Sequence, residues 1–175
     1  MNQNDEPILL RGSRFNVHQL ILRGTDGKEY QREVVRHPGA VVLMPVLEDG
    51  SVVLIENTRA TVGETLLELP AGTRESGESA EVTAARELTE ETGYTAGRLE
   101  LIHEFYSAPG ICDERMHLFV ATELVDGTPH REATEQIENR IASREEIKSW
   151  IGDGTIRDAK TLVGLYAYLQ RSKQD

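Results

Sequence analysis

The sequence predicts an α/β fold, and two kinds of pattern predict it. Runs rich in β-branched and apolar residues, separated by glycine-containing turns, recur through most of the 175-residue chain and indicate strands. Segments 79–92, 143–150 and 158–171 instead carry the spacing and the start and stop residues of helices. The length is about that of one domain, enough to bury roughly 70% of the unfolded surface without disulfides or a structural metal.

Two strands are expected near the N-terminus. Segments 14–22 and 29–37 are β-leaning runs joined by the turn sequence Gly24-Thr25-Asp26-Gly27. Because an isolated hairpin is marginally stable in water, we expect this one to pack on the main domain or on a partner subunit. We therefore divide the chain into a β subdomain, residues 1–38, and a main domain, residues 39–175.

The main domain is expected to begin with a buried strand. Segment 40–47 is continuously apolar, which is typical of a strand covered on both faces, and Glu48-Asp49-Gly50 turns the chain into a second strand at 51–55. Further strands are expected at 66–69, 99–106, 116–124 and 137–142. Near the C-terminus, Ser143 to Glu146 form a capping-box pattern that begins a helix running to Trp150. The core side of the last helix, 158–171, is predicted to consist of Leu162, Leu165, Tyr166 and Leu169.

The most informative stretch is 72–94, GTRESGESAEVTAARELTEETGY. Its fixed points are Gly72, Glu78, Arg86, Glu87, Glu90, Glu91 and Gly93. At about 7% usage for each residue, chance gives this array on the order of once per hundred million start positions. No Gly or Pro occurs between Ser79 and Thr92, and Gly93 follows as a stop, so a helix is expected with Ser76 or Ser79 as its N-cap.

One side of this helix is a cluster of carboxylates. At about 100° per residue, Glu87, Glu90 and Glu91 share one side. The opposite side, predicted to face the core, carries Val82, Ala85, Leu88, Thr89 and Thr92. Like charges one turn apart cost a helix roughly 0.2–0.5 kcal/mol per pair, and a hard divalent cation, Mg²⁺ or Mn²⁺, would offset that cost. Arg86 is spaced to hold Glu90, and it is also a candidate to hold Glu78.

This stretch resembles the Nudix box, the signature of hydrolases that cleave nucleoside diphosphates linked to another moiety. All the fixed positions are met, and the one departure is Tyr94, where an aliphatic residue is commoner. The resemblance implies a strand-loop-helix unit on an α/β/α sandwich with a mixed sheet, in which Mg²⁺ or Mn²⁺ assists the attack of water on a pyrophosphate. The metal ligands that it implies are Glu87, Glu90, Glu91 and the carbonyl of Ala71, supported by Arg86, Glu78 and Gly72.

Other motifs are similar to the ADP-ribose pyrophosphatase branch of the family. Glu68-Leu69-Pro70-Ala71-Gly72 precedes the box, Pro109 follows it at about sixteen positions, and Asp158 to Leu162 read DAKTL. The branch also implies that a glutamate from a later loop helps to activate the water. In 130–138, HREATEQIE, we place this role first on Glu135, then on Glu132 and third on Glu138, while an ordinary exposed acidic loop remains the alternative.

Substrate contacts are assigned from residue chemistry and from this branch. Arg59 and Arg36 are candidates for phosphate or sugar contacts, because a guanidinium binds anions with two donors. Pro109, Gly110 and Glu114 belong to a run that matches the branch, and Glu114 either lines the site or is a solvated loop acid. The branch is often a homodimer whose N-terminal strands complete the adenosine site, so Phe15 or Tyr30 is a candidate to stack on a base.

Composition excludes several other classes. A net charge of −11 disfavours nucleic acid as a partner, since that affinity comes largely from Lys and Arg. The lone Cys112 cannot form an internal disulfide, and no apolar run near the N-terminus predicts a signal or a membrane span, so a cytoplasmic protein is expected. The five histidines have no metal-ligand spacing.

The sequence therefore leads us to expect a Mg²⁺- or Mn²⁺-dependent hydrolase that cleaves ADP-ribose, or a related nucleoside diphosphate sugar, to AMP and ribose 5-phosphate. A hydrolase of GDP-mannose or another nucleotide sugar is the alternative within the same class. A non-catalytic ADP-ribose sensor is the alternative from another class, although the box is complete and the chain lacks a basic DNA-binding segment.

Overall fold

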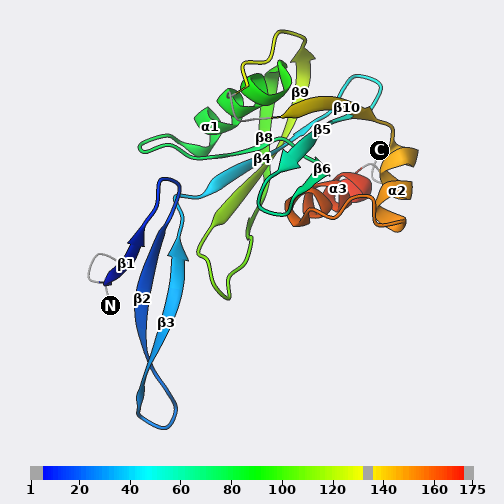
Figure 1. Cartoon of the computed structure of the whole chain (residues 1–175). Helices are drawn as coiled ribbons and strands as arrows, with labels where there is room; N and C mark the ends of the chain where they lie inside the picture. The colour runs from blue at the N-terminus through cyan, green and yellow to red at the C-terminus, as the bar shows by residue number, and fades with distance from the viewer. Residues whose placement is uncertain (1–5, 132–135, 172–175) are drawn as a thin grey trace.

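The computed structural model of the chain describes residues 6–131 and 136–171. Two sheets lie at the centre, between the α1 helix on one side and α2 with α3 on the other (Figure 1). A third sheet, the small sheet of the three N-terminal strands, extends away from them. The predicted α/β fold with a mixed sheet is confirmed, because β4 pairs parallel with β9 and antiparallel with β7.

The elements follow the predicted order closely. The strands are β1 (Ile8–Arg11), β2 (Asn16–Arg23), β3 (Glu29–Arg36), β4 (Ala40–Pro45), β5 (Val52–Arg59), β6 (Glu64–Glu68), β7 (Ala71–Thr73), β8 (Thr95–Tyr106), β9 (Arg115–Val125) and β10 (Ile137–Ala142). The helices are α1 (Ala80–Glu87), continued by the π-helical turn η2 (Leu88–Thr92), then α2 (Arg144–Gly152) and α3 (Ala159–Arg171). The sheets have the strand orders β1-β2-β3, β10-β5-β6 and β7-β4-β9-β8.

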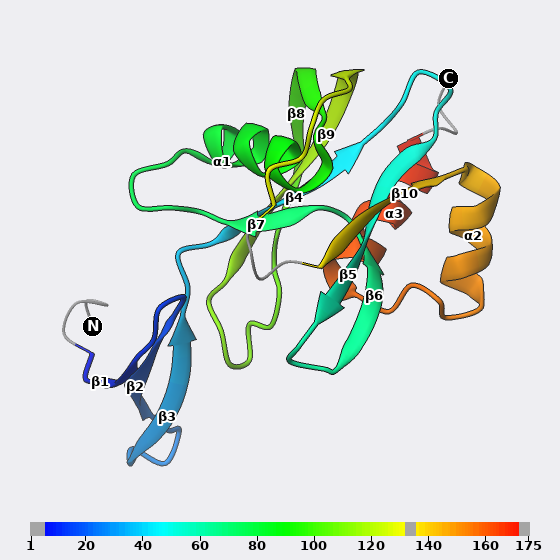
Figure 2. The ribbon, with the colours of Figure 1, turned by 45° about the horizontal axis from the view of Figure 1, so that its top comes forward.

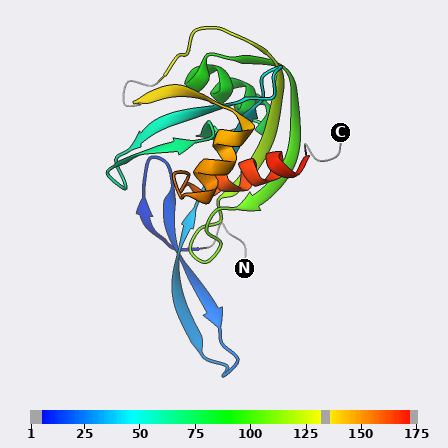
Figure 3. The same cartoon turned by 90° about the vertical axis from the view of Figure 1, so that its right-hand side faces the viewer.

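The buried strand β4 separates two cores. All six of its residues are buried, as its continuously apolar sequence predicts. Successive side chains point to opposite faces, so Ala40, Val42 and Met44 pack in the core under α2 and α3, whereas Val41 and Leu43 pack under α1. The views in Figures 2 and 3 show the helices on these two sides of the sheets.

The helices differ from the sequence prediction in which side chains they bury. The core side of the helix at 80–92 contains Thr83, Ala84, Leu88 and Thr92, whereas Ala85 is exposed and Val82 is 56% exposed. In α3 the buried aromatic is Tyr168 and not Tyr166, which is 52% exposed. The hydroxyl of Tyr168 donates to the carbonyl of Gly50 at 2.6 Å, so a polar contact selects this ring for the inner face.

The predicted N-terminal hairpin is present as β2 and β3, and the sequence analysis missed β1, which pairs with β2. The end of β3 is tied to the segment before β9. The amide of Val35 donates to the carbonyl of Ile111 at 2.8 Å, and Arg36 donates to the carboxylates of Glu6 at 2.6 and 2.9 Å and of Asp113 at 3.0 Å. The small sheet is therefore joined to the main body through a partly buried ion-pair network.

Candidate active site

The strand-loop-helix unit at 71–93 forms as its local sequence predicts. The side chain of Ser79 accepts from the amide of Val82 at 3.3 Å and caps α1. The helix ends at Gly93, whose φ of 85° lies in the left-handed region that glycine adopts without strain. The last turn is π-helical, a form that is often found at functional sites.

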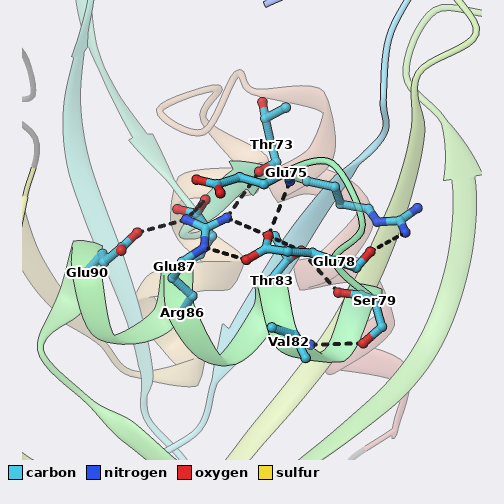
Figure 4. A network of polar contacts seen from close by, with 10 residues as sticks. Thr73, Glu75, Glu78, Ser79, Val82, Thr83, Arg86, Glu87 and Glu90 are labelled. Atoms are coloured by element: carbon cyan, nitrogen blue, oxygen red, sulfur yellow. Dashed lines mark hydrogen bonds and ion pairs between the residues drawn. The ribbon is translucent and has the colours of Figure 1, made fainter.

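Arg86 is the centre of the polar network on this helix (Figure 4). Its Nη1 donates to Glu87 at 2.8 Å and to Glu90 at 2.9 Å, while Nε and Nη2 donate to Glu78 at 3.2 and 3.1 Å. Nη2 also reaches the carbonyl of Thr73 at 3.3 Å. One guanidinium thus holds three carboxylates and the end of β7, which confirms the predicted tie from Arg86 to Glu90 and Glu78.

The pKa of Glu78 reflects its hydrogen bonds with Arg86. The hydrogen bonds from Arg86 lower the pKa of Glu78 to about 2, and the amide of Glu75 and the hydroxyl of Thr83 act in the same direction against the loss of hydration. Glu78 is therefore a fixed negative charge at neutral pH. It lies outside the set of cleft-lining residues and braces Arg86 from behind.

Gly72 lies directly against the carboxylate of Glu87. A Cβ atom built on Gly72 would come within 1.8 Å of the carboxyl carbon of Glu87, and its φ is not in the left-handed region. The glycine is therefore required by the close approach of the helix side chain. On the preceding strand residue, the amide of Ala71 donates to Glu91 at 2.9 Å. Strand β7 therefore contacts the helix through two of the box glutamates, Glu87 and Glu91.

A cleft of about 900 Å³ opens in front of these carboxylates. Its helix wall is lined by Glu87, Glu90 and Glu91, together with Arg86. Glu91 is only 4% exposed although it reaches the cleft. Such a volume suits a ligand of drug or cofactor size.

The wall of the cleft that carries the cations is built around Glu68, which is 1% exposed. Arg59 donates to this carboxylate from Nε at 2.8 Å and from Nη2 at 2.6 Å, and Lys160 pairs with it from α3. Among the described residues, Nη1 of Arg59 makes no further hydrogen bond. Arg59 and Lys160 both line the cleft, so this wall presents cations held by a buried anion.

Asp158 completes the cluster on α3. It accepts from Lys160 at 2.9 Å and from the hydroxyl of Thr161 at 2.6 Å. Burial by itself raises the pKa of Asp158, but the charge of Lys160 and the hydrogen bonds from Thr161 outweigh it and leave the pKa lowered. The hydroxyl of Thr161 is in turn the acceptor for the amide of Leu69, which fixes α3 to the segment that precedes the box.

Comparison with known proteins places this geometry in a family. The model of the NUDIX domain matches residues 35–162. The chain belongs to the Nudix family. The expected membership is confirmed, and the helix at 80–92 is its Nudix helix.

Relatives of this Nudix chain carry related names. The ADP-ribose pyrophosphatase of Bacillus subtilis (strain 168) is 40% identical over 147 residues, which cover 83% of this chain and 79% of that protein. The GDP-mannose pyrophosphatase of Cronobacter sakazakii is 36% identical and covers 79% of this chain and 80% of that protein. A crystal structure of an ADP compounds hydrolase superposes with a TM-score of 0.81 at 21% identity, covering 95% and 90% of the two chains, and supports the fold.

The Nudix cleft brings together eight of the residues that the sequence analysis selected. Glu87, Glu90, Glu91, Arg86, Ala71, Gly72, Arg59 and Glu114 all line it. Glu114 lies 3.5 Å from Nδ1 of His37. Because Glu114 lines the cleft, the site-lining alternative is favoured over the solvated one.

Other selected residues lie elsewhere. Arg36 is engaged by Glu6 and Asp113 and does not line the cleft, and Pro109 and Gly110 are also absent from its walls. Glu138 lies on β10 opposite Glu56 and does not line the cleft either. Glu132 and Glu135 lie outside the described residues. Phe15 and Tyr30 are both exposed on the small sheet, where the hydroxyl of Tyr30 donates to Asp26 at 2.8 Å.

Sequence reasoning missed several residues that line the cleft. Lys160 and Asp158 were visible only as part of the DAKTL motif, and Tyr106 and His130 carried no signal beyond their position near other motifs. Ser13 and Arg14 reach the same cleft from the turn between β1 and β2, although β1 itself was not predicted.

The donor set suits a hard divalent cation, because carboxylates and a main-chain carbonyl are the oxygen ligands that Mg²⁺ and Mn²⁺ prefer. Within residues 6–131 and 136–171, no three His, Cys, Asp or Glu side chains converge as they would around a metal ion. Glu87 and Glu90 are turned to Arg86, and Glu91 accepts from Ala71. A carboxylate has acceptor sites for several partners, so these contacts are compatible with metal ligation.

No helix in the described part of the chain is long and apolar enough to cross a membrane.

Proposed function

We propose that this Nudix protein is a Mg²⁺- or Mn²⁺-dependent pyrophosphohydrolase that cleaves ADP-ribose to AMP and ribose 5-phosphate, or a related nucleoside diphosphate sugar to its nucleoside monophosphate and sugar phosphate. The observation that carries the proposal is one cleft whose lining includes the three box glutamates together with Arg59 and Lys160. Relatives named ADP-ribose pyrophosphatase, at 40% identity in one case, support the choice of substrate.

The cation would be held by Glu87, Glu90, Glu91 and the carbonyl of Ala71, all of which line the cleft. When bound, it supplies Lewis-acid stabilisation of the diphosphate and a lower pKa for the attacking water. Arg86, which is itself held by Glu78, orients two of these glutamates, since it donates to both Glu87 and Glu90.

The cationic wall would receive the diphosphate. Arg59 has two of its nitrogens on Glu68, which fixes the plane of the guanidinium and directs its remaining edge to the cleft. In the reaction, water attacks one phosphorus atom, the bridging P–O bond breaks, and the proton of the water passes to a base. We assign the base to Glu135 first and then to Glu132. Glu138, the third candidate from the sequence, does not line the cleft.

The rest of the protein would contribute an assembly. The small sheet exposes a set of large apolar side chains, namely Ile8, Leu9, Leu10, Phe15, Ile21, Leu22 and Tyr30. We propose that this sheet joins a second copy in a homodimer, with Phe15 or Tyr30 near the base of the substrate, and that the protein acts in the cytoplasm. Light scattering after size exclusion tests the dimer, and a strict monomer at micromolar concentration contradicts it.

A parallel assay tests the activity. Purified protein with Mg²⁺ is offered ADP-ribose, GDP-mannose, NADH and a dinucleoside polyphosphate, and the products are separated by chromatography. Selective release of AMP and ribose 5-phosphate from ADP-ribose is the expected result. Preferred release of GMP from GDP-mannose would instead support the alternative function, which the relative at 36% identity favours. Binding of ADP-ribose without turnover would support the sensor.

A further inference from the structure

The carboxyl end of the Nudix helix is held by residues from outside the box. A helix leaves its last carbonyls without partners inside the helix, and here these carbonyls belong to Glu90, Glu91 and Thr92. The amide of His130 donates to the carbonyl of Glu90 at 2.9 Å. Nε of Arg131 donates to the carbonyl of Glu91 at 3.0 Å, and Nδ2 of Asn139 donates to the carbonyl of Thr92 at 2.7 Å.

The two side chains in this set are also bound to each other. Nη2 of Arg131 donates to Oδ1 of Asn139 at 2.9 Å, so one contact joins the segment that follows β9 to the strand β10. A cation at this position also interacts favourably with the negative end of the helix dipole. Arg131 and Asn139 therefore act on the helix end as a pair.

Packing at Gly93 shows that the contact is close. A Cβ atom on Gly93 would lie 2.7 Å from the carbonyl oxygen of Gly127 and 2.9 Å from the nitrogen of Pro129. The segment 127–131 thus lies directly on the helix stop, in addition to the hydrogen bonds of His130 and Arg131. In Figure 2 the chain that follows β9 passes across the helical unit on its way to β10.

The opposite side of the pair is anchored in a sheet. Asn139 lies opposite Ile55 in the antiparallel pairing of β10 with β5, and Ile55 is fully buried. The position of Asn139 is consequently fixed by the main body. Through Asn139 and Arg131, the backbone of Glu91 and Thr92 is fixed as well, at the point where the carboxylates of Glu90 and Glu91 enter the cleft.

We propose that Arg131 and Asn139 are positioning residues for the metal-binding face of the Nudix helix. They hold the π-helical turn at its carboxyl end, so that Glu90 and Glu91 present their carboxylates to the cleft in one arrangement. The inference rests on the proposed function, because it takes these glutamates as metal ligands. Partners that orient metal ligands typically change metal affinity or activity by roughly 10–100-fold when they are lost.

The test measures Mn²⁺ binding by electron paramagnetic resonance or calorimetry, next to kcat and KM for ADP-ribose. Arg131→Ala and Asn139→Asp are each expected to raise the Mn²⁺ dissociation constant about tenfold or more and to lower kcat with a smaller change in KM. Asn139→Asp keeps the size of the side chain and the acceptor for Arg131, but it replaces the donor to Thr92 with a carboxylate oxygen that repels the carbonyl. Because the two residues share a hydrogen bond, the double variant should lose less than the product of the single effects.

The matched control is Arg140→Ala on the same strand. Arg140 lies 4.0 Å from Glu146 and over the ring of Trp150, and makes no contact with the Nudix helix among the described residues. This variant should keep Mn²⁺ affinity and kcat. Hydrogen exchange of the peptide spanning residues 88–94 should accelerate in Arg131→Ala and not in Arg140→Ala. Arg131→Lys, which keeps the charge, should recover part of the lost affinity.

Several results would overturn the inference. One is an Arg131→Ala protein that melts at a lower temperature but keeps Mn²⁺ affinity and kcat within about twofold of the wild type, against the roughly 10–100-fold expected. Another is an equal loss in Arg140→Ala. If Arg131→Ala does not fold, Asn139→Asp decides by the same criteria. Mn²⁺ binding by a wild-type protein that does not cleave ADP-ribose removes the proposed function alone, whereas no Mn²⁺ binding removes both proposals.

Discussion

The two walls of the cleft hold their charges in opposite ways. On the helix wall one arginine, Arg86, supports the carboxylates of Glu78, Glu87 and Glu90. On the cationic wall one buried carboxylate, Glu68, supports Arg59 and Lys160.

The difference lies in the balance of charge. Glu68 and Asp158 are matched by Arg59 and Lys160, so the cationic wall is neutral as a group and fully formed by the chain itself. On the helix wall, Arg86 donates to Glu87 and to Glu90, and the amide of Ala71 donates to Glu91. The proposed function places a divalent cation at the helix wall, whereas the other wall is formed by residues of the chain itself and would orient the substrate. Substitutions on the two walls should therefore have different kinetic signatures.

The largest effect is expected from Glu91→Gln on the helix wall. The variant should lose more than about 100-fold in kcat, since even the outer partners of metal ligands are worth 10–100-fold. The fold should be retained, because the Gln oxygen can still accept from the amide of Ala71. Turnover of ADP-ribose with Mg²⁺ and a thermal melt measure the two quantities. Glu145→Gln on α2, where Glu145 is exposed and 3.7 Å from Lys148, is the control, and near-normal kcat in Glu91→Gln would contradict the metal assignment.

Arg86→Met should have the next largest effect, and on stability as well as activity. Removing the guanidinium leaves Glu78, Glu87 and Glu90 without their common donor, which should lower the free energy of unfolding by about 2–3 kcal/mol. Urea unfolding at neutral pH measures the loss. Arg98→Met, which removes an exposed pair with Glu100 at 3.4 Å, should cost about 0–1 kcal/mol. Equal losses in the two variants would show that Arg86 is an ordinary surface arginine.

Gly72→Ala tests how closely the helix wall is packed on β7. The added methyl group would overlap the carboxylate of Glu87, so that side chain must move, at a cost of about 1–3 kcal/mol together with weaker Mn²⁺ binding. Gly152→Ala provides the comparison, because nothing lies within 4 Å of a Cβ at that position. Unchanged Mn²⁺ affinity in Gly72→Ala would mean that Glu87 can be displaced without consequence for the site.

A smaller effect of a different kind is expected on the cationic wall. Glu68→Gln keeps the shape of the side chain but weakens the hold on Arg59 and Lys160, so KM for ADP-ribose should rise roughly tenfold while kcat changes less. Glu64→Gln, which alters an exposed pair with Arg157, should leave both constants in place. A loss in kcat with an unchanged KM in Glu68→Gln would contradict the proposal that the cationic wall acts mainly on substrate binding.

The smallest effect concerns pH. Since the pKa of Glu78 is lowered to about 2 in the folded protein, from an ordinary value of 4.5, its contribution to stability is complete above about pH 4.5 and is lost as the pH falls toward 2. In Glu78→Gln the stability should therefore depend less on pH within this window than in the wild type. Urea unfolding at several pH values in that range measures the slopes, and parallel curves would exclude the expected linkage.

Much of the helix wall could be predicted from the sequence because its contacts are local. Arg86, Glu87 and Glu90 are neighbours on one helix, and the spacing alone indicates that they meet. The periodicity placed Val82 and Ala85 in the core, however, and both are exposed. Which side of the helix is buried depends on the strand residues beneath it, here Val41 and Leu43 of β4. A helical wheel drawn from the helix sequence does not contain this information.

The cationic wall and the N-terminal network could not be predicted in the same way, because their contacts join distant segments. Lys160 pairs with Glu68 across 92 positions, and nothing local to either residue identifies its partner. Arg36 was selected as a substrate contact for its chemistry, yet it binds Asp113, 77 positions away, together with Glu6. A guanidinium serves a buried carboxylate as readily as a phosphate, so residue type alone does not separate the two roles.

The residues of the cationic wall lie far apart in the sequence, and this also sets an order of assembly during synthesis. Ribosomes release the N-terminal part first, so the helix with Glu87 and Glu91 is made long before Lys160. Strand β4 likewise cannot complete its pairing until β9 has been made, since Ala40 pairs with Met116. The amide of Leu69 has its acceptor only when Thr161 has been made, 92 residues later. The cleft is consequently completed only when α3 docks, and a nascent chain that stops before α3 carries the acidic helix without the wall that faces it.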